Sequence, residues 1–128
     1  MEQLQNNFNS IQSINPVEAV EYHIIKMARF NMPFCNKLKE YPFTITCYKV
    51  LSFIMFHADK QHTLVISYKE LSERIHINYK TVQNSMKCLE GLGVINIKRG
   101  AKNVSTHITI NREFVDICIV DFLKYGNN

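Results

Sequence analysis

The sequence predicts a mainly α-helical fold with a small β-hairpin. Apolar residues recur at helical spacing in several segments, and helix-capping residues precede them. Two of these segments are short and are separated only by residues 76–78, which are too few for anything but a tight turn. Two alternating strands around a basic turn follow directly. We therefore expect residues 67–111 to organise the chain.

Two long helices are predicted before that stretch. Residues 1–15 lack Lys and Arg and have little periodicity, so we expect a flexible arm. The pair Asn15-Pro16 is typical of a helix start, and an apolar face then continues through residues 16–30. A second helix, over residues 44–58, is apolar on most sides and is expected to be the central helix of the core. Residues 64–66 are then a short apolar strand.

The two short helices have recognisable start and stop signals. Ser67 is expected to cap the first helix, and Glu70 three residues later completes a capping box. Asn78 is a favourable cap for the second helix. The buried stripe of this second helix is predicted to consist of Val82, Met86 and Leu89. Gly91 and Gly93 are expected to end it, because glycine accepts the left-handed conformation.

A β-hairpin is predicted after the second short helix. Residues 94–97 form the first strand and residues 98–103 form a basic turn. Residues 105–111 alternate between polar and apolar side chains, so Ile108 and Ile110 are expected on the buried side.

The last helix is predicted over residues 112–125, with Asn111 as its cap. Its apolar band is wider than one core-facing stripe, so we expect it to be buried on two sides. One side would lie on its own domain and the other on a second subunit. The residues expected at this dimer interface are Phe114, Ile117, Cys118 and Phe122. Residues 16–128 are therefore predicted to form a single domain with flanking dimerisation helices.

Composition and motifs exclude several classes of protein. No apolar run approaches the roughly 20 residues of a membrane span, and no secretory signal begins the chain, so a cytoplasmic protein without membrane contact is expected. The spacing of Cys35, Cys47, Cys88 and Cys118 matches no zinc or redox pattern, which predicts buried, reduced thiols. We expect no metal and no cofactor. The chain has no phosphate-binding glycine loop and no nucleophile elbow, so an enzyme is not predicted.

Positive charge is concentrated in residues 67–103. This segment has seven basic and three acidic residues, whereas the rest of the chain has eight of each. The whole net charge of +4 therefore lies on the two short helices and the hairpin turn. Such a surface attracts polyanions. On charge alone, an ordinary solvated face is an equally good interpretation.

These features together resemble the winged helix-turn-helix family of DNA-binding domains. The residues that carry the resemblance are Leu71, Ile75, Ile77, the helix at 81–89, the sequence LEGLGVI at 89–95 and the turn at 98–103. The resemblance implies a mainly α fold with a small β-hairpin wing and extra N- and C-terminal helices. It places the helix-turn-helix at residues 67–92 and the wing at 94–111. It also implies that the strand at 64–66 pairs with the wing.

The resemblance implies that the second short helix enters the major groove of DNA by its N-terminal turns. Gln and Asn can bond adenine, and Lys can contact guanine or phosphate. The residues expected to contact DNA from this helix and its cap are Asn78, Tyr79, Lys80, Thr81, Gln83, Asn84 and Lys87. Thr81 has the alternative role of capping the helix.

Two further groups of residues are expected near the DNA backbone and the minor groove. The start of the first short helix contributes Ser67, Tyr68 and Lys69. The wing contributes Lys98, Arg99, Lys102 and Asn103, among which Arg99 is the best candidate for insertion into the minor groove. Arg74 lies near a helix end, where it can simply complement the helix dipole.

The implied function is sequence-specific binding of double-stranded DNA as a homodimer, by a transcriptional repressor or other regulator. One alternative is a plasmid or phage DNA-maintenance protein, which would be a centromere-binding partition adaptor or a replication initiator with a partition or replication partner. Another is a winged helix used only for protein–protein contact. The polar and basic residues predicted on the second short helix and the wing of this chain favour DNA binding over a role in protein–protein contact alone.

Overall fold

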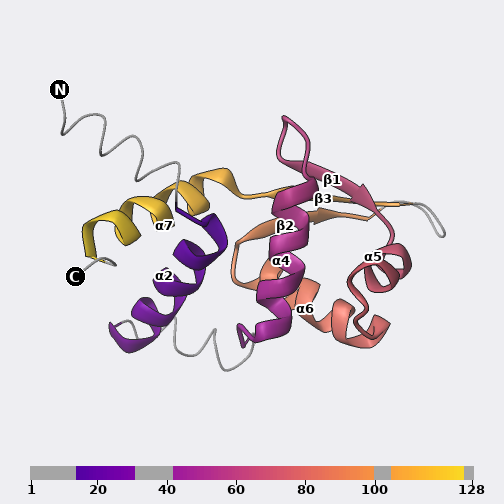
Figure 1. The fold of residues 1–128 in the computed structure, drawn as a ribbon, viewed down its shortest axis with the longest axis horizontal. Coiled ribbons are helices and arrows are strands. Elements are labelled where there is room, and N and C mark those ends of the chain that lie inside the picture. The colour runs from indigo at the N-terminus through magenta and orange to yellow at the C-terminus, as the bar shows by residue number, and fades with distance from the viewer. Residues whose placement is uncertain (1–13, 31–41, 100–104, 126–128) are drawn as a thin grey trace.

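The computed structural model of the chain describes residues 14–30, 42–99 and 105–125. These residues form helices and strands in the order α2 (Pro16–Phe30), α4 (Ile45–His57), β1 (Thr63–Ile66), α5 (Tyr68–Ile75), α6 (Tyr79–Gly91), β2 (Ile95–Lys98), β3 (Thr106–Ile110) and α7 (Arg112–Tyr125) (Figure 1). The predicted mainly α fold with a small antiparallel sheet is confirmed. Most of the predicted N-terminal arm and of the hairpin turn lies outside the described residues.

The three strands form an antiparallel sheet in the order β1-β3-β2. The central residue of the sheet is Ile108 in β3, which pairs with Leu64 of β1 on one side and with Ile97 of β2 on the other. Ile108 and Ile110 are buried and His107 is exposed, as the alternation predicts. The expected pairing of the strand around residues 64–66 with the hairpin is therefore confirmed.

Helix α4 is the central helix of the fold and packs against α2, α5, α6 and β3. Thr44 caps it, because the Thr44 hydroxyl accepts a hydrogen bond from the backbone N–H of Cys47 at 3.3 Å. Its buried side consists of Cys47, Val50, Leu51 and Ile54. Ile45 and Phe56 on the other sides of the helix are exposed, so the apolar surface of α4 is only partly covered within the described residues.

Helices α5 and α6 are joined by residues 76–78, as the sequence predicts. The Ser67 hydroxyl accepts a hydrogen bond from the backbone N–H of Glu70 at 3.1 Å and so caps α5. His76 adopts a left-handed conformation with φ 55°, which ends α5 and turns the chain. The Asn78 side chain then accepts a hydrogen bond from the backbone N–H of Lys80 at 2.8 Å and caps α6.

Helix α6 ends at a left-handed glycine. Gly93 has φ +84°, and its backbone N–H donates to the Glu90 carbonyl while that of Val94 donates to the Leu89 carbonyl. This arrangement satisfies carbonyl groups that the helix end would leave unpaired. Gly93 therefore ends the helix in the left-handed conformation, as predicted. The same prediction is wrong for Gly91, which is the last residue of the helix itself.

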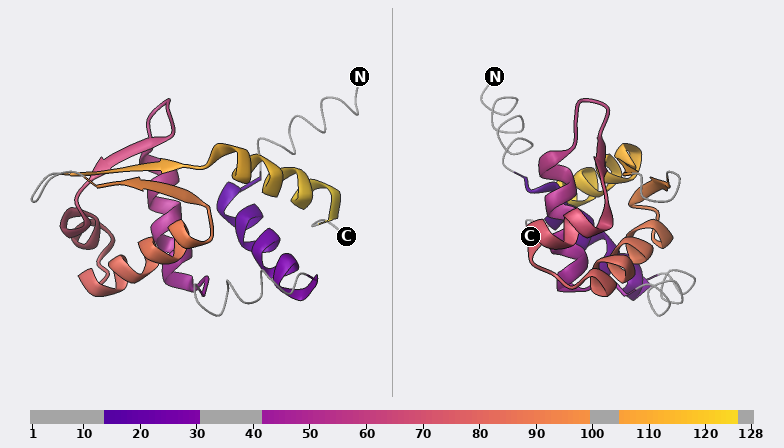
Figure 2. Two further views of the ribbon diagram at one scale, coloured as in Figure 1. Left: turned by 180° about the vertical axis from the view of Figure 1, so that it is seen from behind. Right: turned by 90° about the vertical axis from the view of Figure 1, so that its right-hand side faces the viewer.

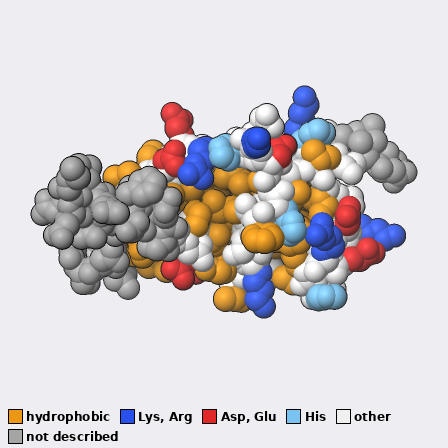
Figure 3. Space-filling view, turned by 45° about the horizontal axis from the view of Figure 1, so that its top comes forward, with side chains coloured by type: hydrophobic (Ala, Val, Ile, Leu, Met, Phe, Trp, Pro, Cys, Tyr) orange, Lys and Arg blue, Asp and Glu red, His pale blue; other side chains and the backbone are white. Residues whose placement is uncertain are grey.

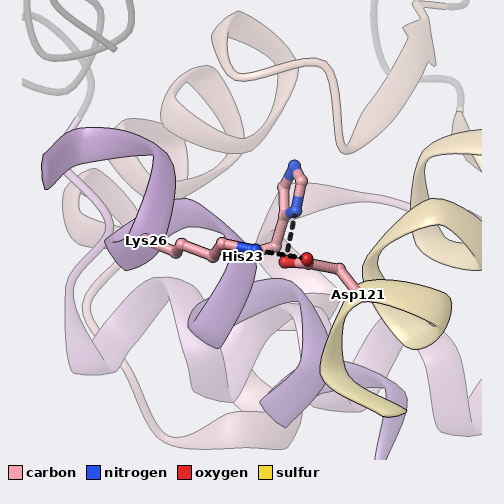
Figure 4. Close-up of polar contacts among 3 residues, drawn as sticks. All are labelled: His23, Lys26 and Asp121. Carbon is pink, nitrogen blue, oxygen red and sulfur yellow. Dashed lines mark hydrogen bonds and ion pairs between the residues drawn. The ribbon is translucent and has the colours of Figure 1, made fainter. Parts of the chain in front are cut away.

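Helices α2 and α7 lie side by side at the end of the molecule opposite to α5 (Figures 1 and 2). The Asp121 carboxylate of α7 binds two residues of α2: it accepts a hydrogen bond from the Lys26 ammonium at 2.5 Å, and the His23 Nδ1 atom lies 3.2 Å away (Figure 4). Tyr22 and Phe122 add an edge-to-face aromatic contact between the same helices. The first and last of the described helices therefore pack together, through residues that lie 95 and 98 positions apart in the sequence.

Candidate nucleic-acid interface

Helix α6 has one buried and one exposed side. The predicted stripe of Val82, Met86 and Leu89 is fully buried, as expected. Several polar residues on the other sides are exposed: Tyr79, Lys80, Thr81, Gln83, Asn84 and Lys87. All but Thr81 of these recur along one side of the helix at intervals of one and three residues. The structure therefore places five of the predicted DNA-contact residues on one side of α6, and Thr81 lies off that side.

The side chains of Ser67 and Asn78 are occupied as helix caps. Their oxygen atoms accept hydrogen bonds from the backbone of their own helices, so these residues position α5 and α6. The capping role considered for Thr81 belongs to Asn78, and Thr81 remains exposed. Lys69 is also exposed in the first turn of α5, where free N–H groups favour an anion.

The Tyr68 hydroxyl is not at the surface, where a residue that contacts the DNA backbone is expected. This hydroxyl is buried and makes no hydrogen bond to any described residue, so it is not presented to a phosphate. Burial raises the pKa of the Tyr68 phenol, and the nearby positive charge of Arg99 opposes that rise. The turn end of the β2–β3 hairpin, where Arg99 follows β2, thus lies near the start of α5.

The β2–β3 hairpin contributes two exposed basic residues close to its described end. Lys98 pairs with His107 across the sheet, and Arg99 follows directly after β2. The other two predicted hairpin residues, Lys102 and Asn103, lie outside the described residues. On the face that Figure 3 shows, the described Lys and Arg side chains stand apart and alternate with acidic and hydrophobic ones. A basic surface is therefore not continuous over that face.

The exposed Arg74 side chain contacts α4. Its guanidinium carbon lies 4.9 Å from the centroid of the Phe53 ring on α4. This cation–π contact orients the Arg74 side chain towards α4, which gives it a structural role in joining α4 and α5.

The predicted dimer residues on α7 divide into inner and outer ones. Cys118 is fully buried, Phe114 contacts His23 with ring centroids 5.6 Å apart, and Phe122 contacts Tyr22. The burial of Cys118 corrects its expected place on an outward-facing interface. Phe114 and Phe122 are only partly buried, so their place at a dimer interface stays a prediction. The helical pattern could not distinguish the side that faces α2. Ile117 is 57% exposed and Val120 is 50% exposed, so they form the outward apolar surface of α7.

A cavity of about 580 Å³ lies between α4 and α6 and was not predicted. Its lining includes Thr44 and Cys47 of α4 and Asn84, Lys87 and Cys88 of α6. The two cysteines are far apart in the sequence and carry no motif. Only the packing of the two helices brings them together.

Comparisons with known proteins give no match, either to a protein-family model or to a curated protein. Among the described residues, no helix has the length and apolar character required to cross a membrane. The same residues contain no cluster of three or more His, Cys, Asp or Glu side chains suited to a metal ion.

Proposed function

We propose that this chain is a winged helix-turn-helix protein that binds double-stranded DNA sequence-specifically as a homodimer and acts as a transcriptional repressor or regulator. Helix α6 would lie in the major groove, and the β2–β3 hairpin would be the wing on the minor groove or backbone. The protein would work in the cytoplasm without enzymatic activity.

The order of the elements supports this proposal. A central helix, a strand, two short helices joined by a tight turn and a β-hairpin follow one another as α4, β1, α5, α6 and β2–β3. The strand β1 pairs with β3, the second strand of the hairpin, so the hairpin is joined to the strand that leads into α5. The caps at Ser67 and Asn78 fix both helices, so α6 is a rigid element on which a recognition surface can be built.

The exposed side of α6 is the observation that carries the proposal. Gln83 and Asn84 offer both a donor and an acceptor, the pair of groups that matches the major-groove edge of adenine. Lys80 and Lys87 flank them and can contact guanine or neutralise phosphates.

Dimerisation is supported by the outward surface of α7. Ile117 and Val120 lie one turn apart and are both at least half exposed. Burying them against a second copy of α7 would remove apolar surface from water. Two copies would then present two α6 helices to a site with two-fold symmetry.

The test is a titration of the purified protein against DNA from its own upstream region and against a scrambled duplex, at two salt concentrations. We expect a preference for the upstream DNA and a steep loss of affinity with salt. Equal affinity for both duplexes, or an affinity indifferent to salt, would contradict the proposal. The length of the footprint distinguishes one palindrome from the repeated sites of a partition or replication protein.

A matched pair of variants locates the recognition surface. Gln83→Ala on α6 is expected to reduce the preference for upstream DNA by about 1–3 kcal/mol, because a bidentate base contact is lost. Gln61→Ala makes the same chemical change in the exposed turn before β1 and is expected to leave binding unchanged. Equal effects of the two variants would remove Gln83 from the interface.

A further inference from the structure

Two thiols from different helices meet beside the cavity between α4 and α6. The Cys88 Sγ atom donates to the Pro42 carbonyl oxygen at 3.0 Å, and the Cys47 Sγ atom lies 3.7 Å from the same oxygen. Both residues line the cavity of about 580 Å³. They are otherwise buried, with exposed fractions of 2% for Cys47 and 5% for Cys88. A small molecule that enters the cavity therefore meets both sulfur atoms.

The surroundings of Cys47 stabilise a thiolate. Cys47 lies in the first turn of α4, where free N–H groups and the helix dipole favour a negative charge. The Thr44 hydroxyl donates to the Cys47 Sγ atom at 3.5 Å. Interaction with the Cys88 thiol lowers the pKa of Cys47 to about 6, and interaction with Cys47 and burial raise the pKa of Cys88. Cys47, in the first turn of α4, is thus the more readily ionised of the two thiols.

We propose that Cys47 and Cys88 form a redox-active dithiol that hydrogen peroxide converts to an intramolecular disulfide between α4 and α6. The Cys47 thiolate attacks one peroxide oxygen, the O–O bond breaks, and the departing hydroxide takes a proton to become water. Cys47 is then a sulfenic acid. The Cys88 sulfur attacks the Cys47 sulfur, the S–O bond breaks, and the second hydroxide leaves as water with the Cys88 proton. The two sulfur atoms lose two electrons, which reduce the peroxide.

Cys118 is the internal comparison for this pair. It is fully buried in the core and does not line the cavity. Burial raises the pKa of the Cys118 thiol to about 12. We therefore expect Cys118 to stay reduced under conditions that oxidise Cys47 and Cys88.

The experiment uses the full chain, first reduced and then treated with hydrogen peroxide at neutral pH. Remaining thiols are alkylated, and peptides are mapped by mass spectrometry without reduction. We expect the peptides that contain Cys47 and Cys88 to be joined, lighter by two hydrogen atoms, and to be separated by dithiothreitol. Two free thiols at these positions, or a disulfide to Cys35 or Cys118 instead, would overturn the proposal.

Variants separate the two steps. Cys88→Ser lacks the second thiol, so Cys47 is expected to stop at the sulfenic acid and to be labelled by dimedone. Cys118→Ser is the control and is expected to form the same disulfide as the unmodified chain. Absence of the dimedone label on Cys47 in a folded Cys88→Ser protein would contradict the proposed first step. Circular dichroism checks the fold, and the mapping of the unmodified chain does not depend on any variant.

Discussion

Asp121 on α7 and Lys26 on α2 form an ion pair in which the ammonium lies 2.5 Å from a carboxylate oxygen. The Asp121 side chain is only 14% exposed, so this contact is shielded by the two helices that it joins. It connects the first described helix to the last one, at a position where His23 also contacts the carboxylate. One acidic residue therefore links α2 and α7 through polar contacts, beside the aromatic contact between Tyr22 and Phe122.

Replacing Asp121 by Asn is expected to lower the melting temperature by a few degrees, because the contacts with Lys26 and His23 lose their charged acceptor. Asp116→Asn is the matched control on the same helix. Asp116 forms an exposed ion pair with Arg112 at 3.1 Å, and such surface pairs contribute little. Thermal unfolding followed by circular dichroism measures both variants, and equal melting temperatures of the two would refute this role of Asp121.

The same ion pair gives the stability a defined pH dependence. Burial raises the pKa of Asp121, but the hydrogen bonds from Lys26 and His23 outweigh that effect and leave the pKa below its ordinary value of 3.8. A carboxyl whose pKa is lower in the folded state stabilises the fold above its unfolded pKa, and the effect is lost as the pH falls through the folded value. The difference in stability between the unmodified chain and Asp121→Asn should therefore be full at pH 6 and shrink below about pH 4. A constant difference over this range would show that Asn fails for a reason other than charge.

We expect removal of the Tyr68 hydroxyl to stabilise the protein. This hydroxyl is buried and makes no hydrogen bond to a described residue, and a buried polar group without a partner reduces stability. Tyr68→Phe removes only this oxygen and is expected to raise the free energy of unfolding by about 1 kcal/mol. Tyr125→Phe, at a ring that is 56% exposed, is the control with no expected change. Urea titration measures both, and a destabilised Tyr68→Phe protein would mean that the hydroxyl has a partner.

Local features of the fold follow from the sequence, whereas the contacts between elements do not. The caps at Ser67 and Asn78 depend on neighbours within a few residues, so the pattern of residue types is sufficient to place them. The sides of the hairpin strands follow from the alternation around Ile108 in the same way.

Other features depend on which elements pack together. The band of apolar residues on α7 contains Phe114, Ile117 and Phe122 without showing which of them faces α2. Tyr68 lies near Arg99, and Cys47 near Cys88, because segments far apart in the chain pack against each other. Such pairs have no local signal, so a single sequence does not reveal them.

Substitution of two basic side chains tests the proposed DNA interface through the salt dependence of DNA affinity. Lys87→Ala and Arg99→Ala are each expected to weaken binding and to reduce the slope of log affinity against log salt by about one, provided each residue neutralises one phosphate. Lys124→Ala, on an exposed residue of α7 far from α6, is expected to leave the slope unchanged. Fluorescence anisotropy at several salt concentrations gives the slopes. A slope for Lys87→Ala or Arg99→Ala equal to that of the unmodified chain would exclude that residue from the phosphate contacts.

The two kinds of apolar residue on α7 predict different consequences of adding a charge. Phe122 packs edge-to-face against Tyr22 with ring centroids 5.5 Å apart, so Phe122→Asp is expected to lower the stability of each protomer. Ile117 is 57% exposed, so Ile117→Asp is expected to leave the melting temperature of the protomer nearly unchanged. It should still weaken the proposed dimer more than tenfold, because burial of an Ile side chain contributes about 1.5–3 kcal/mol. Ile117→Val keeps the apolar surface and is expected to remain dimeric. Light scattering after size exclusion measures the mass, and an Ile117→Asp protein as dimeric as the unmodified chain would exclude this side of α7 as the interface.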